Sequence, residues 1–477
     1  MKNTLFWFRR DLRLQDNVGL YHALKNSDKV ACMFVFDKGI LSSLGKQDKR
    51  VDFIWNAVFN LKEELQNLGS DLIVIYDKPE VAVAKLAKKY KVNSVYANED
   101  YEPNARKRDQ DISDYLEKNN ITFNIFKDQV IFAKNEISNG NKQPFKVFTP
   151  YLNQWLNKFT INDIFDYTDE KLYIKLAKFN IDKMPSLEDL NFEKTNVSNI
   201  KIGFSNKDAK LILSNFCKNK IAKYDQIRDF PKMAGVSFLG IHNRFGTISV
   251  RELLRSAIEV KKINPNSSKG VDTWISEIVW RDFYFQILYN FPHVVYEPFN
   301  KEYEKFPWEN NMENFQKWCM GETGYPIVDA AMKQLNNTGY MHNRLRMITA
   351  SFLTKNLLID YRLGEQYFAS KLLDFDLSAN NGGWQWAAST GCDAQPYFRI
   401  FNPILQSEKF DEQGDFIKKN LSVFKNIDGK YLHEPWKYAD KLKDGGVILG
   451  KDYPYPIVDY KSSRQKTLDI FKSFNQK

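Results

Sequence analysis

Short apolar runs alternate with helical stretches over residues 1–130 of the chain. The apolar runs that predict strands cover residues 5–8, 30–36, 71–76, 94–97 and 122–126. Stretches with apolar positions three or four apart, which predict helices, cover residues 17–26, 49–68, 80–90 and 104–119. Strands that are apolar throughout and alternate with helices are typical of a parallel sheet covered on both faces. We therefore predict an α/β domain over residues 1–130, built on a five-stranded, doubly wound parallel sheet.

The pattern changes twice further along the chain. Residues 131–200 are rich in Asn and Lys with isolated aromatic residues, and ISNGNKQP at 137–144 predicts an exposed turn, so we interpret 131–200 as an interdomain connection. Over residues 201–477 apolar positions recur at helical spacing, with Gly or Pro between the segments. This part of the chain is predicted to form a mostly α-helical C-terminal domain.

Composition and charge narrow the class of protein. Of the 477 residues, 43% are hydrophobic and 27% are charged, which is typical of a globular protein and not of a disordered chain. The formal net charge of +10 fits either a well-solvated surface or a polyanionic partner such as nucleic acid. Charge alone does not separate these two interpretations.

The cysteines and the length of the apolar runs indicate in which compartment of the cell the protein is expected. The four cysteines stand far apart with no C-x-x-C pair, which favours a reduced, cytoplasmic protein and gives no reason to expect a metal site. The N-terminal apolar stretch is too short for a signal peptide, and the longest apolar runs have the length of strands. We expect a soluble monomer with no membrane span.

The predicted sheet lacks a nucleotide-binding loop. Its first strand is followed by Arg9, Arg10 and Asp11, and the chain contains no G-x-G-x-x-G or Walker sequence. A dinucleotide at this edge of the sheet is therefore disfavoured.

One segment of the helical region combines aromatic and charged residues on a single face. In WISEIVWRDFY at 274–284, helical spacing places Trp274, Glu277, Ile278 and Arg281 together. The pattern fits an amphipathic helix with a buried ion pair, or a pocket wall in which an aromatic plane lies beside an acceptor and a cation.

Two further segments carry similar chemistry. In TGYMHNRLRM at 338–347, Asn343, Arg346 and Met347 share a helix face. The segment DFDLSANNGGWQWAAST at 374–390 combines acids, amides, glycines and tryptophans, and its glycines could approach a ligand closely or adopt positive φ. Amides and acids together can bind both the donors and the acceptors of a heterocycle.

These segments, taken in order, resemble the DNA photolyase and cryptochrome family, in particular its microbial class I photolyases for cyclobutane pyrimidine dimers. The resemblance covers nearly the whole chain. It is carried by WFRRDLRLQDN at 7–17, YDQIRDFP at 224–231, WISEIVWRDFY, the stretch from ETGYPIVDAAM at 322 to PYFRIFNP at 396–403, and HEPWK at 433–437.

The resemblance implies that the helical domain binds FAD. Asn380 corresponds to the amide that faces flavin N5, and Arg346 with Asp374 corresponds to a buried ion pair beside the flavin ring. The positions that match the flavin-binding residues of the family are Tyr224, Val236, Ser237, Phe238, Leu239, Gly240, Trp274, Glu277, Arg281, Asn343, Arg346, Asp374, Asp376 and Asn380.

The resemblance further implies light-driven electron transfer from reduced FAD to a pyrimidine dimer in UV-damaged DNA, which photolyases are known to flip out of the duplex. The residues that match its catalytic and dimer-contacting set are Glu277, Trp280, Asn343, Met347, Asn380 and Trp386. Those that match its DNA contacts are Arg228, Glu277, Trp280, Arg281, Asn343, Arg344 and Arg399. The electron relay that photoreduces FAD matches Trp308, Tyr361 and Trp384.

Other members of the family are alternatives. Photolyases for (6-4) photoproducts carry histidines where this chain has Asn343 and Met347, so the cyclobutane dimer is favoured as substrate. A cryptochrome photoreceptor with little or no repair activity would share the flavin site without needing the residues that contact the dimer. A flavoprotein that has kept the fold without photochemistry is a third possibility.

Three positions depart from the family pattern. The phosphate-binding segment, usually Thr-Ser-x-Leu-Ser, is Val236-Ser237-Phe238-Leu239-Gly240 and lacks two hydroxyl donors. We expect FAD binding to be retained, and weaker if nothing replaces those donors.

The second departure lies in the electron relay. Its middle position, a tryptophan in the family, is Tyr361, and a neutral tyrosine radical forms only with loss of a proton. Slower or rerouted photoreduction is expected, with repair intact.

The third departure concerns the antenna pigment. The Y-E-x-N-E pattern used for folate reads Tyr101-Glu102-Pro103-Asn104-Ala105, without the last carboxylate, and the Cys-Lys pair expected before residues 298–299 is absent. A methenyltetrahydrofolate antenna is disfavoured, while a deazaflavin, a flavin or no antenna stay open.

Overall fold

The computed structural model describes residues 2–178, 183–233 and 235–476, and these residues form two compact units. Unit 1 comprises Met1–Lys223 together with Ser237–Asn290, and unit 2 comprises Tyr224–Val236 together with Phe291–Lys477. The division predicted from the sequence, at residues 130 and 200, stays a prediction. It follows changes of pattern along the chain, whereas the units follow proximity in space.

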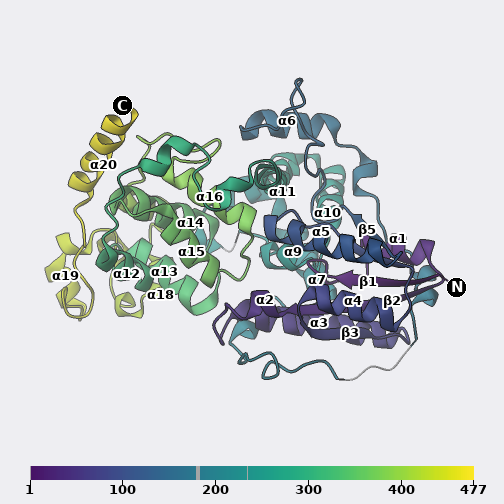
Figure 1. Ribbon diagram of the computed structural model, residues 1–477. Helices are drawn as coiled ribbons and strands as arrows, with labels where there is room; N and C mark the ends of the chain where they lie inside the picture. The colour runs from purple at the N-terminus through teal and green to yellow at the C-terminus, as the bar shows by residue number, and fades with distance from the viewer. Residues whose placement is uncertain (1, 179–182, 234, 477) are drawn as a thin grey trace. The chain divides into compact units, whose positions relative to one another are not determined.

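Unit 1 is built on the predicted five-stranded parallel sheet (Figure 1). The strands are β1 (Asn3–Phe8), β2 (Lys29–Asp37), β3 (Leu72–Asp77), β4 (Ser94–Asn98) and β5 (Thr122–Phe126). Their order is β3-β2-β1-β4-β5, and every neighbouring pair is parallel. The prediction of a doubly wound parallel sheet is confirmed.

The helices between these strands begin and end close to the predicted bounds. They are α1 (Val18–Asn26), α2 (Lys38–Leu41), α3 (Lys49–Asn67), α4 (Pro79–Lys89) and α5 (Pro103–Lys118), of which the short α2 was not predicted. Local chemistry sets their starts: the side chains of Asn17 and Asp48 cap α1 and α3, and proline is the first residue of α4 and α5. Alternate strand residues such as Leu5, Met33 and Val95 pack in one core with α4 and α5.

The segment interpreted as an interdomain connection contains a helix that the pattern did not predict. This helix, α6 (Phe148–Lys158), buries Phe148, Tyr151 and Trp155 at helical spacing. The surrounding Asn and Lys residues obscured that short repeat. Residues 179–182 lie outside the described part of the chain.

The predicted helical region is confirmed over residues 201–233 and 235–476, where the only strand-like pairing is an isolated bridge between Leu449 and Tyr453. Its helices in unit 1 are α7 (Asn206–Asn219), α9 (Gly240–Phe245), α10 (Val250–Ile263) and α11 (Ser268–Asn290). Those in unit 2 are α8 (Tyr224–Ile227), α12 (Met312–Met320), α13 (Pro326–Thr338), α14 (Asn343–Ser351), a π-helix (Phe352–Asn356), α15 (Tyr361–Lys371), α16 (Leu377–Ala388), α17 (Pro403–Phe410), α18 (Asp415–Asn420), α19 (Ala439–Asp444) and α20 (Tyr460–Asn475).

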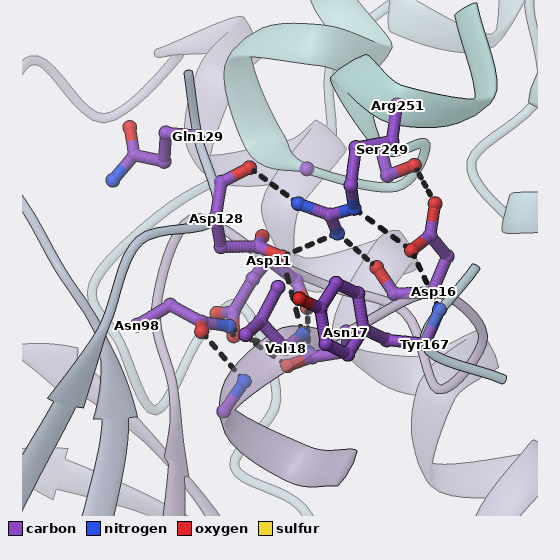
Figure 2. A network of polar contacts seen from close by, with 12 residues as sticks. Asp11, Asp16, Asn17, Val18, Asn98, Asp128, Gln129, Tyr167, Ser249 and Arg251 are labelled. Atoms are coloured by element: carbon purple, nitrogen blue, oxygen red, sulfur yellow. Dashed lines mark hydrogen bonds and ion pairs between the residues drawn. The ribbon is translucent and has the colours of Figure 1, made fainter. Parts of the chain in front are cut away.

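A buried network of charges joins α10 to the loops that follow β1 and β5 (Figure 2). Arg251 on α10 donates to Asp16 (Nε–Oδ1 2.9 Å) and to Asp128 (Nη2–Oδ1 2.8 Å), and all three side chains are at most 4% exposed. Arg13 pairs with Asp128 at 2.7 Å, and Ser249 donates to Asp16. Burial by itself would raise the pKa of Asp16, but the neighbouring guanidinium groups lower it below its usual range. The carboxylates therefore stay charged.

Replacing Arg251 tests how strongly this network stabilises unit 1. Arg251→Met leaves Asp16 and Asp128 buried with less positive charge between them, so we expect the free energy of unfolding to fall by about 3–5 kcal/mol. Urea unfolding followed by circular dichroism measures the change. Arg255→Met is the matched control, because Arg255 also pairs with Asp16 but its side chain is 23% exposed. Equal losses in the two variants would contradict a central role for Arg251.

Candidate functional site

Helix α11 presents the predicted aromatic and charged residues on one side. Trp274 and Ile278 are buried, whereas Glu277 and Arg281 are partly exposed. Arg281 donates to the backbone carbonyl of Gln129, and its guanidinium carbon lies 4.6 Å from the ring centroid of Phe285. Arg281 is thus held in place by unit 1 itself, and Glu277 lies one helical turn before it.

Trp280, predicted to contact the dimer, stacks on an aromatic residue that sequence reasoning missed. Its ring lies 3.6 Å from that of Phe148 at an interplanar angle of 9°. Phe283 and Tyr284 approach it at 5.6 and 5.5 Å. Trp280 remains partly exposed.

The predicted phosphate-binding segment adopts a constrained backbone. Phe238 has a φ of 61°, in the left-handed region that a bulky side chain rarely occupies. The backbone N–H of Leu239 donates to Ser237 Oγ at 3.3 Å, and α9 begins at the next residue, Gly240. The hydroxyl of Ser237, which the segment retains, therefore accepts a hydrogen bond within its own turn. Val236 and Ser237 are partly exposed.

In unit 2, α14 brings two predicted dimer contacts together. Asn343 Nδ2 lies 4.0 Å from Met347 Sδ, one turn away, and both side chains are accessible. The helix begins at Asn343 because His342 accepts a hydrogen bond from the backbone N–H of Arg344 at 3.2 Å. Burial lowers the pKa of His342 to about 4, so this cap is neutral at pH 7.

The predicted ion pair beside the flavin is formed. Arg346 Nη2 lies 2.8 and 3.0 Å from the two carboxylate oxygens of Asp374, and its Nε donates to the carbonyl of Met341 at 2.9 Å. The pair was expected to be buried, but its side chains are 27% and 17% exposed. One side of the pair is open for a ligand.

Helix α16 corrects the interpretation of the Asn-Asn-Gly-Gly segment. These residues are helical, and neither Gly382 nor Gly383 has a positive φ. Asp376 caps the helix by accepting from Ser378 N at 3.1 Å. Because of helical spacing, Asp376, Asn380 and Gly383 lie on one face.

This face of α16 has the properties that a bound flavin requires. Asn380 Nδ2 donates to the carbonyl of Glu365 at 3.1 Å, which leaves its Oδ1 as an acceptor. A Cβ atom added at Gly383 would meet nothing within 4 Å outside its own helix. A fixed amide acceptor beside an open glycine, together with the exposed side of the Arg346–Asp374 pair, fits the polar edge of a planar heterocycle.

Glu365 is a further buried acid that sequence reasoning missed. It accepts from Asn381 Nδ2 at 3.1 Å, and burial raises its pKa to about 7. A single Glu within YRLGEQYF gives no signal in the sequence, because burial decides its chemistry.

The three predicted relay residues pack in or against one hydrophobic cluster of unit 2. Trp384 and Tyr361 are 2% and 1% exposed, while Trp308 is partly exposed and lies 4.5 Å from Phe306. The phenol oxygen of Tyr361 is buried and finds no hydrogen-bond partner among the residues that the structure describes. Burial and the charge of Glu365 raise the pKa of this phenol well above its usual value.

The predicted DNA-binding arginines of unit 2 differ in their surroundings. Arg344 pairs with Asp229 at 2.9 Å and lies over the ring of Phe410, whereas Arg399 is exposed. Arg228 lies 3.9 Å from the same Asp229. Each of these residues keeps a surface that a phosphate could reach.

The remaining predicted residues of unit 2 are both aromatic. Tyr224 is 8% exposed, and the guanidinium of Arg228 lies 5.9 Å from its ring centroid. Trp386 is partly exposed and contacts Phe401 edge to face at 6.5 Å.

Comparison with known proteins places these features in a family. The family described as DNA photolyase matches residues 4–170, and the FAD binding domain of DNA photolyase matches residues 274–473. The chain is 39% identical to the deoxyribodipyrimidine photo-lyase of Escherichia coli over 479 residues, which cover 99% of each chain.

Two solved structures give the same result for the fold. A class III photolyase from Agrobacterium tumefaciens matches with a TM-score of 0.92 and 31% identity, covering 100% of this chain and 98% of the other. A cryptochrome from Synechocystis matches with a TM-score of 0.88 and 26% identity, covering 98% and 99% of the two chains. Among the described residues, no helix is both long and apolar enough to cross a membrane.

Two glycine variants test whether the open face of α16 receives the cofactor. Gly383→Ala adds a methyl group in open space within a helix, so we expect the apoprotein to gain about 0.5–1 kcal/mol of stability while its affinity for FAD falls. Gly364→Ala is the contrasting variant, since its Cβ would collide with the Trp384 ring and lie 2.5 Å from Leu353 Cδ2. That overpacking costs about 1–3 kcal/mol. Thermal unfolding and FAD titration measure both effects, and unchanged FAD affinity in Gly383→Ala would exclude a flavin next to this residue.

Proposed function

The chain belongs to the DNA photolyase family, and we propose that it uses light to split cyclobutane pyrimidine dimers in UV-damaged DNA, with FAD as its cofactor. The observation that carries the choice of substrate is on α11, where the supported indole of Trp280 lies one turn from the carboxylate of Glu277. An aromatic plane next to an acceptor matches a pyrimidine, which offers a flat ring and N–H donors at its edge.

The residues of unit 2 bind and orient the cofactor. FAD, when bound in its reduced form and excited by light, supplies the electron that opens the cyclobutane ring and recovers it when the two pyrimidines separate. Arg346 and Asp374 place fixed charges beside the ring, and Asn380 offers its Oδ1 to a flavin N–H. Asp376, at the start of the same helix, and Tyr224 complete the contacts proposed for this unit.

Unit 1 contributes the remaining proposed cofactor contacts. These are Trp274, Glu277 and Arg281 on α11, with Ser237, Phe238, Leu239 and Gly240 before and at the start of α9; Val236 directly precedes them. Ser237 Oγ accepts from Leu239 N, which leaves its O–H as a donor to a cofactor phosphate, beside backbone N–H groups and Arg281.

The dimer and its DNA use a second set of side chains, which shares Glu277 and Asn343 with the proposed cofactor contacts. For the dimer, Glu277 is proposed to accept from the base edge, Trp280 and Trp386 to supply aromatic surfaces, and Asn343 and Met347 to contact the bases. Arg228, Arg344 and Arg399 hold phosphates, so they position the DNA without reading its sequence.

A cryptochrome photoreceptor is the second candidate, and the similarity to the Synechocystis cryptochrome supports keeping it. A photoreceptor has no need of a dimer-binding surface. The accessible Asn343–Met347 pair and the supported Trp280 favour repair.

Location, assembly and antenna complete the proposal. All four cysteines lie among the described residues and are free thiols, in agreement with a reducing cytoplasm. We propose a monomer there. Ala105 lies at the third position of α5, where the folate pattern has a carboxylate, so a folate antenna is disfavoured, while a deazaflavin, a flavin or no antenna stay open.

A repair assay with Glu277 variants tests the function. Protein with reduced FAD is incubated with an oligonucleotide that carries a thymine dimer, in blue light and in the dark, and base absorbance is followed. We expect repair only in light. Glu277→Ala should lower kcat/KM about 10- to 100-fold, as loss of a hydrogen bond to a charged group predicts, with FAD still bound.

Glu277→Gln is the matched control, because it keeps an acceptor oxygen and should retain more activity than Glu277→Ala. Absence of light-dependent repair by protein with bound, reduced FAD would overturn the repair function. Loss of FAD from Glu277→Ala would instead show that Glu277 serves the cofactor.

Photoreduction of oxidised FAD provides a separate test of the relay. Among the described residues, the buried phenol of Tyr361 has no hydrogen-bond acceptor for the proton that oxidation releases. Tyr361→Trp should therefore accelerate photoreduction at least about tenfold, since an indole can carry the charge without immediate proton loss. Timed illumination in the presence of a reductant measures the rate. Tyr361→Phe should match the unaltered protein if Tyr361 does not conduct. An unchanged rate in Tyr361→Trp would contradict the hypothesis, and repair by pre-reduced protein should not change.

A further inference from the structure

Beyond the residues assigned to the substrate, we propose that Phe148 is a positioning residue that makes Trp280 a one-sided stacking platform for a flipped pyrimidine. This inference rests on the substrate role proposed above for Trp280. It gives α6 a function in recognition of the damaged base. From the sequence pattern, the segment that contains α6 was interpreted only as an interdomain connection.

The stack between Phe148 and Trp280 covers one face of the indole. With centroids 3.6 Å apart and planes 9° from parallel, the rings are in van der Waals contact with almost no lateral offset. A base therefore cannot stack on that face. Phe283 meets the edge of both rings, at 5.8 Å from Phe148 and 5.6 Å from Trp280, and limits sideways movement.

Helix α6 holds Phe148 firmly in this position. Phe148 is its first residue and is 7% exposed, and α6 packs against α11. One and two turns later, Tyr151 and Trp155 are fully buried. Trp155 Nε1 donates to Asp282 Oδ2 on α11 at 3.1 Å, which fixes α6 to the helix that carries Trp280.

The surroundings of Trp280 outside this stack are more open. Tyr284, one turn later on α11, lies 5.5 Å from the indole with the ring planes 32° apart, and Trp280 keeps part of its surface in solvent, as do Glu277 and Arg281 on the same helix. A large aromatic side chain that is rigidly backed and still exposed is organised for a planar ligand before that ligand binds. Rigidity of this kind raises affinity because less conformational freedom is lost on binding.

The chemistry of the platform selects a damaged base that has left the duplex. Stacking on a bare aromatic plane is available only to a base without neighbours of its own, and it does not depend on sequence. Phe148 should therefore increase affinity for a flipped dimer and contribute nothing to the affinity for intact duplex.

Binding in the dark separates this role from catalysis. We expect Phe148→Ala to weaken binding to a thymine-dimer oligonucleotide about tenfold, which is the size of effect expected for loss of part of one stacking contact. Affinity for the undamaged oligonucleotide and the repair rate at saturating substrate should not change. Phe148→Leu should show the same loss, because it keeps an apolar side chain without a plane, and Phe148→Tyr should restore affinity.

Fluorine NMR of protein labelled with 5-fluorotryptophan reports on the indole directly. The Trp280 resonance, assigned by its absence from Trp280→Phe, should shift or broaden in Phe148→Ala and Phe148→Leu and stay in place in Phe148→Tyr. If Phe148→Ala does not fold, the same binding and NMR measurements on Phe148→Leu test the inference.

Trp280→Ala distinguishes failure of the inference from failure of the function on which it rests. If Trp280→Ala weakens dimer binding and both Phe148 variants leave it unchanged, Phe148 has no positioning role. An equal loss for damaged and undamaged DNA would also overturn the inference, because it indicates a structural effect only. If Trp280→Ala itself has no effect on dimer binding, the substrate role proposed for Trp280 is wrong, and the positioning role inferred for Phe148 is then wrong as well.

Discussion

The pairing of buried charges around Arg251 is the constraint on which unit 1 depends. Four charged groups, Arg13, Asp16, Asp128 and Arg251, lie almost out of contact with water, and each is tolerable only because the others are present. The network links loops at the carboxyl edge of the sheet to α10, although Asp16 and Arg251 lie far apart along the chain. It lies at the carboxyl edge of the sheet, the edge at which a doubly wound domain commonly binds a nucleotide.

The network has a consequence for the residues assigned to DNA and cofactor in unit 1. Because α10 is fixed to the sheet, the helix that follows it, α11, starts from a fixed point. Two contacts then hold α11 near its middle: Arg281 donates to the Gln129 carbonyl, next to Asp128, and Asp282 accepts from Trp155 of α6. Glu277 and Trp280 therefore stand on a helix whose orientation is set by polar contacts to the loop after β5 and to α6.

In unit 2, buried side-chain amides rather than charged groups fix the helix that carries proposed cofactor contacts. There α16 carries two sets of residues on different faces. Asn381 and Gln385 face inward, where they bind the Val294 carbonyl, and Asn381 also contacts Glu365. On another face, Asn380 and Gly383 are left accessible, one to two turns after the buried cap Asp376. Since the inward amides fix the rotation of the helix about its axis, they decide which side chains a cofactor can reach.

The sequence by itself determined the elements that depend on local rules. The strands of the N-terminal sheet, the longer helices between them and the helical character of the second half follow from apolar spacing and caps, and all were predicted. Family motifs also located candidates such as Arg346 with Asp374 and Asn343 with Met347, which the structure brings into contact.

Tertiary structure alone decided the features that depend on burial and on partners far away in sequence. Helix α6 was missed because its stability comes from Phe148, Tyr151 and Trp155, which pack on other elements. The stack of Phe148 on Trp280 was missed because the two residues are far apart in the sequence. The Asn-Asn-Gly-Gly segment is helical although glycine disfavours a helix, because the amides on either side are anchored. The raised pKa of Glu365 and the isolated phenol of Tyr361 have the same origin: desolvation is a property of the folded surroundings, and no residue type or spacing encodes it.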